Sequence, residues 1–96
     1  MINVIMYELY ISSQFKKDIK AYRYKSKIIG ALQDSINDIR WEKLLSKRYN
    51  DHELKWTFAG VRECHIFPDV LLVYEIDKIK KCLRLIRLGS HSELFG

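Results

Sequence analysis

Residues 51–69 read DHELKWTFAGVRECHIFPD, and the rest of the chain is best understood outward from them. Apolar and polar residues alternate on both sides of Ala59-Gly60, a dipeptide suited to a tight turn. We therefore predict a β-hairpin made of two strands, residues 53–58 and residues 61–67, joined by a two-residue connection.

The predicted hairpin brings two histidines together. If Phe58 opposes Val61, then Leu54 opposes His65, and His52 becomes the diagonal neighbour of His65, roughly 7 Å away on the same sheet face. The same register puts Trp56 opposite Glu63. Because side chains alternate along a strand, a register slip of one residue would move every one of them to the other face.

A tight turn at Pro68-Asp69 and two further strands, residues 70–76 and 81–88, complete the predicted antiparallel meander. One face of this sheet would carry the histidines, and we call it the histidine face. The residues predicted to share it are Glu63, Val70, Leu72, Tyr74, Leu83, Leu85 and Arg87. The residues predicted to face the core are Cys64, Ile66, Leu71, Val73, Ile86 and Leu88.

The tail, LGSHSELF at residues 88–95, holds the third histidine of the sequence. His91 follows the last strand closely enough to swing back over the sheet, with Leu94 and Phe95 holding the tail down. His52, His65, His91, Asp69 and Arg87 would then surround one site. Imidazoles suit both proton transfers of general acid–base cleavage of a phosphodiester, and a guanidinium can stabilise the developing phosphoryl charge.

The first half of the chain predicts a strand followed by two helices. Residues 7–12 have strand character, and Ser12 or Ser13 is placed to cap a helix with Phe15, Ile19 and Tyr22 on one side. A second helix begins near Ser26 and carries the apolar stripe Ile29, Leu32, Ile36 and Ile39. The two helices form an αα-hairpin whose stripes must pack on the sheet.

Residues 40–50, RWEKLLSKRYN, predict a frayed helix end and a loop. Trp41 and Tyr49 lie among basic residues, which suits stacking on unpaired bases. Core anchoring of Trp41 and Leu44 beneath the loop is the more ordinary alternative.

Composition limits the class of protein. The chain has 96 residues, 48% hydrophobic and 30% charged, which fits one domain spanning residues 1–96 with one core. The net charge is +5, and the excess lies in residues 1–50. A basic face of this kind fits RNA or an acidic protein, and a solvated helix face is the plain alternative.

No stretch is apolar enough to predict a membrane span, and the N-terminus lacks the pattern of a signal peptide, so we expect a cytoplasmic protein. Met6 is a possible alternative start to Met1. The two cysteines, Cys64 and Cys82, are predicted core thiols too far apart for a disulfide. Zinc ligation by the same histidines is a further alternative, although no ligand pair has the short spacing of a structural zinc motif.

Four segments resemble the YafQ branch of the RelE-like toxins of bacterial toxin–antitoxin pairs. They are DH-x-L at residues 51–54, R-E-C-H-x-x-P-D at 62–69, LLVY at 71–74 and R-x-G-[ST]-H-x-x-L-F at 87–95. In the N-terminal half only F-K-K-D at residues 15–18 is similar. The resemblance implies an α+β, RelE-like fold, in which an N-terminal strand and αα-hairpin pack on one face of an antiparallel sheet of four to five strands.

The resemblance also implies a function. Family members are cytoplasmic endoribonucleases that cut messenger RNA on the ribosome, and a cognate antitoxin inhibits each of them. For this chain we expect cleavage without a metal or small-molecule cofactor, and an acidic antitoxin that suits its basic surface. Carried over by motif, the catalytic set would be His52, His65, Asp69, His91 and Phe95. Arg87 would contact a phosphate, and Arg62 and Glu63 belong to the same motif. A simple ion pair between Glu63 and Arg87 is the plain alternative.

This sequence departs from the family pattern at two positions. Val70 stands where some members have an aromatic residue after the motif aspartate, and Val70 cannot stack on a base. Glu53 stands where a proline often follows the first motif histidine, which adds a negative charge beside the expected phosphate path. Both departures bear on substrate positioning, and neither removes a proton-transfer group.

Two other functions fit the same sequence. A non-catalytic member of the fold could block a protein target, as ParE-like toxins do with gyrase, although such a protein would not need the histidines. A plain RNA-binding domain would bind with strong salt dependence and would not cleave.

Overall fold

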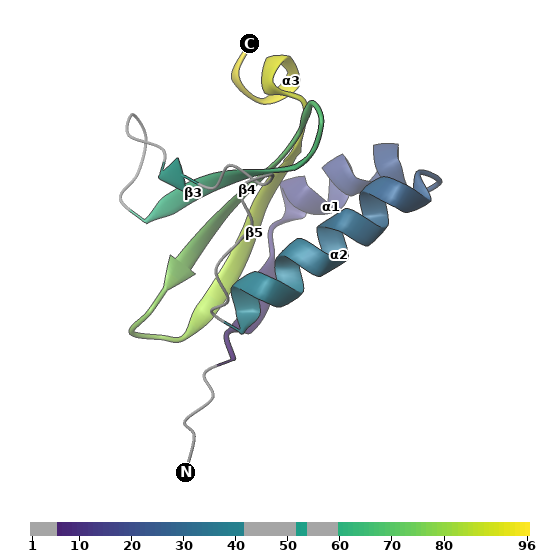
Figure 1. Cartoon of the computed structure of the whole chain (residues 1–96). Coiled ribbons are helices and arrows are strands. Elements are labelled where there is room, and N and C mark those ends of the chain that lie inside the picture. Colours follow the sequence, from purple (N-terminus) through teal and green to yellow (C-terminus); the bar gives the residue numbers. More distant parts are fainter. Residues whose placement is uncertain (1–5, 42–51, 54–59) are drawn as a thin grey trace.

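The structure is a computed structural model that describes residues 6–41, 52–53 and 60–96. Figure 1 shows two long helical segments on one side of a sheet and a short helix at the C-terminal end. The elements in chain order are β1 (Glu8–Ile11), α1 (Ser13–Ile19), the 3-10 helix η1 (Lys20–Tyr22), α2 (Ser26–Arg40), β2 (His52–Glu53), β3 (Val61–Phe67), β4 (Val70–Asp77), β5 (Cys82–Gly89) and α3 (His91–Phe95).

The sheet has five strands in the order β1-β5-β4-β3-β2. The strands β2 to β5 pair in an antiparallel manner, but β1 pairs in parallel with β5. The predicted α+β class is confirmed, with the correction that the sheet is mixed. A parallel pair needs a crossover between its strands, and here the helices and the meander supply it.

The helices form where the sequence predicts them. Ser12 caps α1, because its Oγ accepts a hydrogen bond from the Phe15 N–H at 3.0 Å. The predicted first helix changes to 3-10 geometry at η1, and Phe15 and Tyr22 are both buried. The apolar stripe of α2 faces the sheet, and Ser35 satisfies its buried hydroxyl by donating to the Ala31 carbonyl at 2.8 Å.

The core between helices and sheet differs in part from the prediction. Cys64, Ile66 and Leu88 face the helices as expected. The strand residues that also lie in this core, although they were predicted on the histidine face, are Val70, Leu72, Tyr74, Leu83 and Leu85. Leu71 and Val73 are buried but lie outside that cluster. The alternation predicted for β4 and for much of β5 was therefore wrong.

Two β-bulges explain the error. The β3–β4 register shifts between His65 and Phe67, and the β4–β5 register shifts between Val73 and Tyr74, where Ile86 is the extra residue. A bulge puts one additional residue into one strand, so every position beyond it changes face relative to a regular ladder. The second bulge leaves Arg87 on the histidine face, as predicted, although Leu85 faces the core.

The register of β2 against β3 also differs from the prediction. His52 opposes Glu63 and Glu53 opposes Arg62, a shift of four positions from a two-residue hairpin. Because four is even, the face is conserved, and His65 remains diagonal to His52. The predicted partners Leu54 and Trp56 lie outside the described residues, as do Leu44 and Tyr49.

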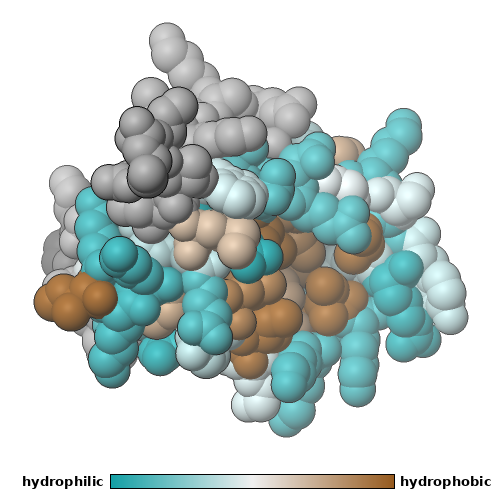
Figure 2. Space-filling model, turned by 90° about the horizontal axis from the view of Figure 1, so that it is seen from below, coloured by the Kyte–Doolittle hydropathy of each residue, from teal (hydrophilic) through white to brown (hydrophobic). Residues whose placement is uncertain are grey.

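Other predictions concern the surface. Trp41 ends α2 and is 40% exposed, so it is not a fully buried anchor. Cys64 and Cys82 are both buried, as predicted. Within the described residues, no helix is sufficiently long and apolar to span a membrane. Figure 2, seen from the end opposite α3, shows hydrophobic side chains gathered in one patch and bordered by hydrophilic ones.

Candidate active site

The strand registers align three candidate residues, and Val73 between two of them, across the sheet. His52 opposes Glu63, Glu63 opposes Val73, and Val73 opposes Arg87. Neighbouring strands lie about 4.8 Å apart, so the backbones of Glu63 and Arg87 are about 10 Å from each other. The row brings one histidine, one carboxylate and one guanidinium position onto the histidine face.

A second row lies two residues further along β3. His65 opposes Leu71, and Leu71 opposes Gly89. Two residues of strand span about 7 Å, so this row is next to the first one. Gly89 ends β5, and His91 follows it by two residues. The registers therefore bring the backbones carrying His65, His52 and Arg87, and the attachment point of His91, to one region of the sheet.

His91 is the first residue of α3, and a capping box holds this short helix in place. Ser90 Oγ accepts from the Glu93 N–H at 3.2 Å, and the Glu93 carboxylate accepts from the Ser90 N–H at 2.8 Å. The rings of His91 and Phe95 lie one helical turn apart, with centroids separated by 5.2 Å. Both side chains are exposed, so the imidazole is accessible to a ligand.

Asp69 lies in the turn between β3 and β4 with a positive φ of 56°, a conformation that aspartate tolerates better than most residues. Figure 1 shows this turn at the same end of the molecule as α3. Burial raises the pKa of Tyr22, and the carboxylates of Glu93, Asp69 and Asp18 raise it further.

Arg87 is held by a carboxylate from α1. Its Nε donates to Asp18 Oδ2 at 2.8 Å, and its Nη2 donates to Oδ1 at 3.3 Å. Asp18 Oδ2 also accepts from the Leu88 N–H at 2.9 Å. Burial raises the pKa of Asp18, but the hydrogen bonds from Arg87, Leu88 and Gln14 outweigh it and lower that pKa below 3.8. Donating these hydrogen bonds to Asp18 raises the pKa of Arg87.

The remaining predicted site residues have different environments. Glu63 is buried on the histidine face, with 6% of its surface exposed, and Arg62 is half-buried in the β3 ladder. The ion-pair partner of Arg87 is Asp18. Val70 was expected beside the substrate, but its side chain is buried in the core against the helices. The reason is the bulge in β3, which turns Val70 away from the histidine face.

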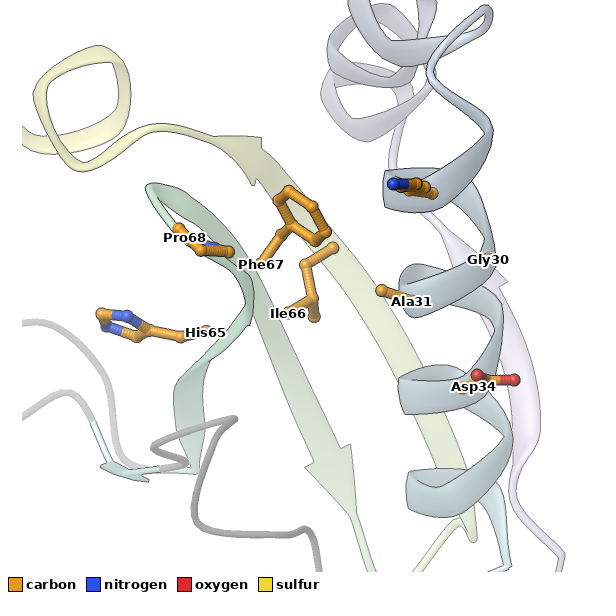
Figure 3. Close-up of a pocket in the computed structure, with 8 residues that line it drawn as sticks. Gly30, Ala31, Asp34, His65, Ile66, Phe67 and Pro68 are labelled. Atoms are coloured by element: carbon orange, nitrogen blue, oxygen red, sulfur yellow. The ribbon is translucent and has the colours of Figure 1, made fainter.

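A cavity of about 600 Å³ borders this region on the helix side of the sheet. Figure 3 shows Phe67 and Ile66 extending between β3 and α2, whereas the ring of His65 points away from α2. The imidazole of His65 therefore lies on the other side of β3 from most of this cavity. The described residues that line it are Lys27, Gly30, Ala31, Asp34, His65, Ile66, Phe67 and Pro68.

Sequence reasoning missed two features. The S-x-x-E pattern of Ser90 to Glu93 is a readable capping-box signature, and it would have predicted α3. Asp18 had a weaker signal, because it is one acidic residue in a basic segment and its partner Arg87 lies 69 positions away. Within the described residues, no three His, Cys, Asp or Glu side chains converge as metal ligands.

Comparison with protein families gives a match over residues 7–96 to the family described as "Bacterial toxin of type II toxin-antitoxin system, YafQ". The mRNA interferase toxin YafQ of Escherichia coli (strain B / BL21-DE3) is 33% identical to this chain over 94 residues, which is 97% of this chain and 100% of that protein. The similarity therefore extends over almost the whole sequence.

Solved structures agree with this match. A metal-bound toxin from Helicobacter pylori is 41% identical and superposes with a TM-score of 0.87, covering 94% of this chain and 100% of that one. The toxin in the E. coli DinJ-YafQ toxin-antitoxin complex is 31% identical with a TM-score of 0.85, covering 96% of this chain and 100% of that one. Sequence and fold thus lead to the same group of proteins.

Proposed function

Because the chain belongs to the YafQ family of toxins of type II toxin–antitoxin systems, we propose that it is an mRNA interferase, an endoribonuclease that cuts messenger RNA. The observation that carries the proposal is the strand register, which aligns the positions of His52, His65 and Arg87 on one face and ends β5 two residues before His91. These are the residue types that acid–base cleavage of RNA needs.

The chemistry follows from these groups. One imidazole of His52, His65 and His91 accepts the proton of the ribose 2'-hydroxyl, whose oxygen then attacks the adjacent phosphorus. A second proton-transfer group, another imidazole or Asp69, donates a proton to the leaving 5'-oxygen. The P–O5' bond breaks as the O2'–P bond forms, so the products carry a 2',3'-cyclic phosphate and a 5'-hydroxyl. Every proton lost from one group is gained at another.

Arg87 and Phe95 position the substrate in this scheme. Arg87 donates to the phosphoryl oxygens, where negative charge increases in the transition state. Phe95 lies beside His91 and is 43% exposed, so it can support the imidazole on one side and contact the sugar or base on the other. Glu63 stands in one row with His52 and Arg87, and Arg62 precedes it on β3; we assign both to holding the β3 part of the site.

Three partners belong to this function. The ribosome presents the message, and the basic N-terminal half of the chain suits binding to RNA. The third partner is an acidic antitoxin, because the related E. coli toxin is found in a complex named DinJ-YafQ. An acidic segment that folds onto the basic surface would provide inhibition by charge and by coverage of the site.

Primer extension on a translated message tests the function. After induction of the wild-type chain we expect discrete cuts within translated codons, and His91→Ala should reduce the cleavage rate by about 10² to 10⁴, which is the usual contribution of one general acid or base. Growth arrest should be relieved in parallel.

Ser92→Ala is the matched control, because Ser92 lies next to His91 on the same exposed turn and has no proton-transfer group in the scheme. It should cut like the wild type. Intact message with continued growth arrest would favour a toxin that blocks a protein target. Undiminished cleavage by a folded His91→Ala variant would contradict the assignment of His91.

A further inference from the structure

Two hydrogen bonds fix the Asp18 carboxylate, in addition to those from Arg87. The Gln14 amide donates to Oδ1 at 3.1 Å within α1, and the Leu88 N–H donates to Oδ2 at 2.9 Å from β5. The Asp18 side chain is 9% exposed, whereas that of Arg87 is 34% exposed. The carboxylate is thus an anchor in the fold, and the guanidinium projects from it toward solvent.

The hydrogen-bond pattern orients the guanidinium. Arginine has five N–H donors in a rigid planar fork, and the bonds of Nε and Nη2 to Asp18 use two of them. The other three donors lie on the remaining edges of the same plane. The backbone of Arg87 stands in the row that contains the positions of Glu63 and His52.

From this geometry we propose that Asp18 is a positioning residue for RNA cleavage: it holds the Arg87 guanidinium so that its remaining donors meet the scissile phosphate. The proposal rests on the proposed ribonuclease function. Asp18 does not touch the substrate and acts through Arg87 alone. Holding a flexible side chain in its working orientation before the reaction removes an entropic cost from the transition state.

The carboxylate has an electrostatic consequence as well. It places a negative charge beside the cation that must attract a phosphate, and Glu93 adds a second one. Asp18 therefore weakens the general attraction of this site to RNA, while it improves the orientation of the Arg87 guanidinium. Its removal should affect the maximal rate and the Michaelis constant in different ways, which a purely structural contact between α1 and β5 would not do.

Asp18→Asn tests the proposal, because the amide oxygen can still accept from Leu88 while the charge that orients Arg87 is lost. In cleavage of a message on purified ribosomes we expect kcat to fall by about 10- to 100-fold, with KM unchanged or lower. The matched control is Glu75→Gln. The Glu75 carboxylate lies 3.2 Å from the guanidinium of Arg84, which is on β5 as Arg87 is. Glu75→Gln should leave both constants as in the wild type.

A double-mutant cycle separates positioning from stability. If Asp18 works through Arg87, adding Asp18→Asn to Arg87→Ala should cause no further loss of kcat. The proposal would be overturned if Asp18→Asn had the wild-type kcat. It would also be overturned if Asp18→Asn lowered kcat as much in the Arg87→Ala background as it does in the wild type.

An NMR measurement tests the hold on Arg87 without any substrate. The Nε–H of Arg87 should exchange with water more slowly than that of Arg84, and Asp18→Asn should abolish the difference. Equal exchange of Arg87 and Arg84 in the wild type would overturn the proposal even if the chain cleaves RNA. If the wild type does not cleave RNA, the ribonuclease function is contradicted. The NMR measurement would still show whether Asp18 holds the Arg87 guanidinium.

Discussion

At the scale of single residues, the functional end of the molecule depends on contacts between distant positions. The motif residues His52, His65, Asp69 and His91 could be recognised from the sequence, because their order and spacing are distinctive. Asp18 could not be assigned in this way. Its role depends on the path of α1 beside β5, and no local pattern encodes that path.

The same contact gives a pH dependence of stability. Because the folded-state pKa of Asp18 lies below its ordinary value of 3.8, its contribution is fully present above that pH and is lost as the pH falls through the folded value. We expect Asp18→Asn to reduce the free energy of unfolding by about 1–3 kcal/mol at neutral pH. Urea unfolding of both proteins should show that the difference between their free energies of unfolding narrows below pH 3.8. A gap that stayed constant down to acidic pH would contradict this role of the charge.

At the scale of elements, α1 closes the edge of β5 beyond the end of β1. Ser12 N–H donates to the Leu85 carbonyl at 3.0 Å, Ser12 Oγ donates to the Ile86 carbonyl at 2.8 Å, and Asp18 accepts from Leu88. A strand edge with unsatisfied groups invites pairing with other chains, and these contacts protect it. They also explain how the bulge at Ile86 is tolerated.

Element identity was largely predictable, but register was not. Apolar periodicity and the Ser12 cap located the helices, and Pro68-Asp69 located a tight turn in which Phe67 opposes Val70, as predicted. The bulges at Ile66 and Ile86 left no mark in the alternation of apolar residues, because both faces of β4 are buried. Val70, Leu72 and Tyr74 could therefore be assigned to either face with equal ease.

The helix α3 yields a prediction of its own. Five residues are too few for a stable isolated helix, so the capping box largely determines how often His91 is in place. Ser90→Ala should weaken α3 by about 1 kcal/mol and lower the cleavage rate by up to about fivefold. Ser90→Asp, which introduces another good N-cap, should restore the cleavage rate. A wild-type cleavage rate for Ser90→Ala, or no recovery with Ser90→Asp, would show that the cap does not position His91.

At the scale of the whole molecule, the two halves of the chain differ in net charge and in the function that we propose for each. The N-terminal half carries ten Lys or Arg and five Asp or Glu, and the remaining half carries seven of each. The exposed lysines of α1 and η1, Lys16, Lys17 and Lys20, contribute to this excess. The basic half thus suits attraction to RNA, while the C-terminal half carries the residues that we propose as acid–base groups.

The central claim is that these groups cleave RNA through attack of the substrate's own 2'-hydroxyl. The most direct measurement replaces the 2'-hydroxyl with hydrogen at the single nucleotide 5' to a mapped cut and assays cleavage on ribosomes with the purified chain. We expect cutting at that position to be abolished, while an unmodified message yields a 2',3'-cyclic phosphate. Cleavage of the 2'-deoxy position at the rate of the unmodified message would contradict the claim.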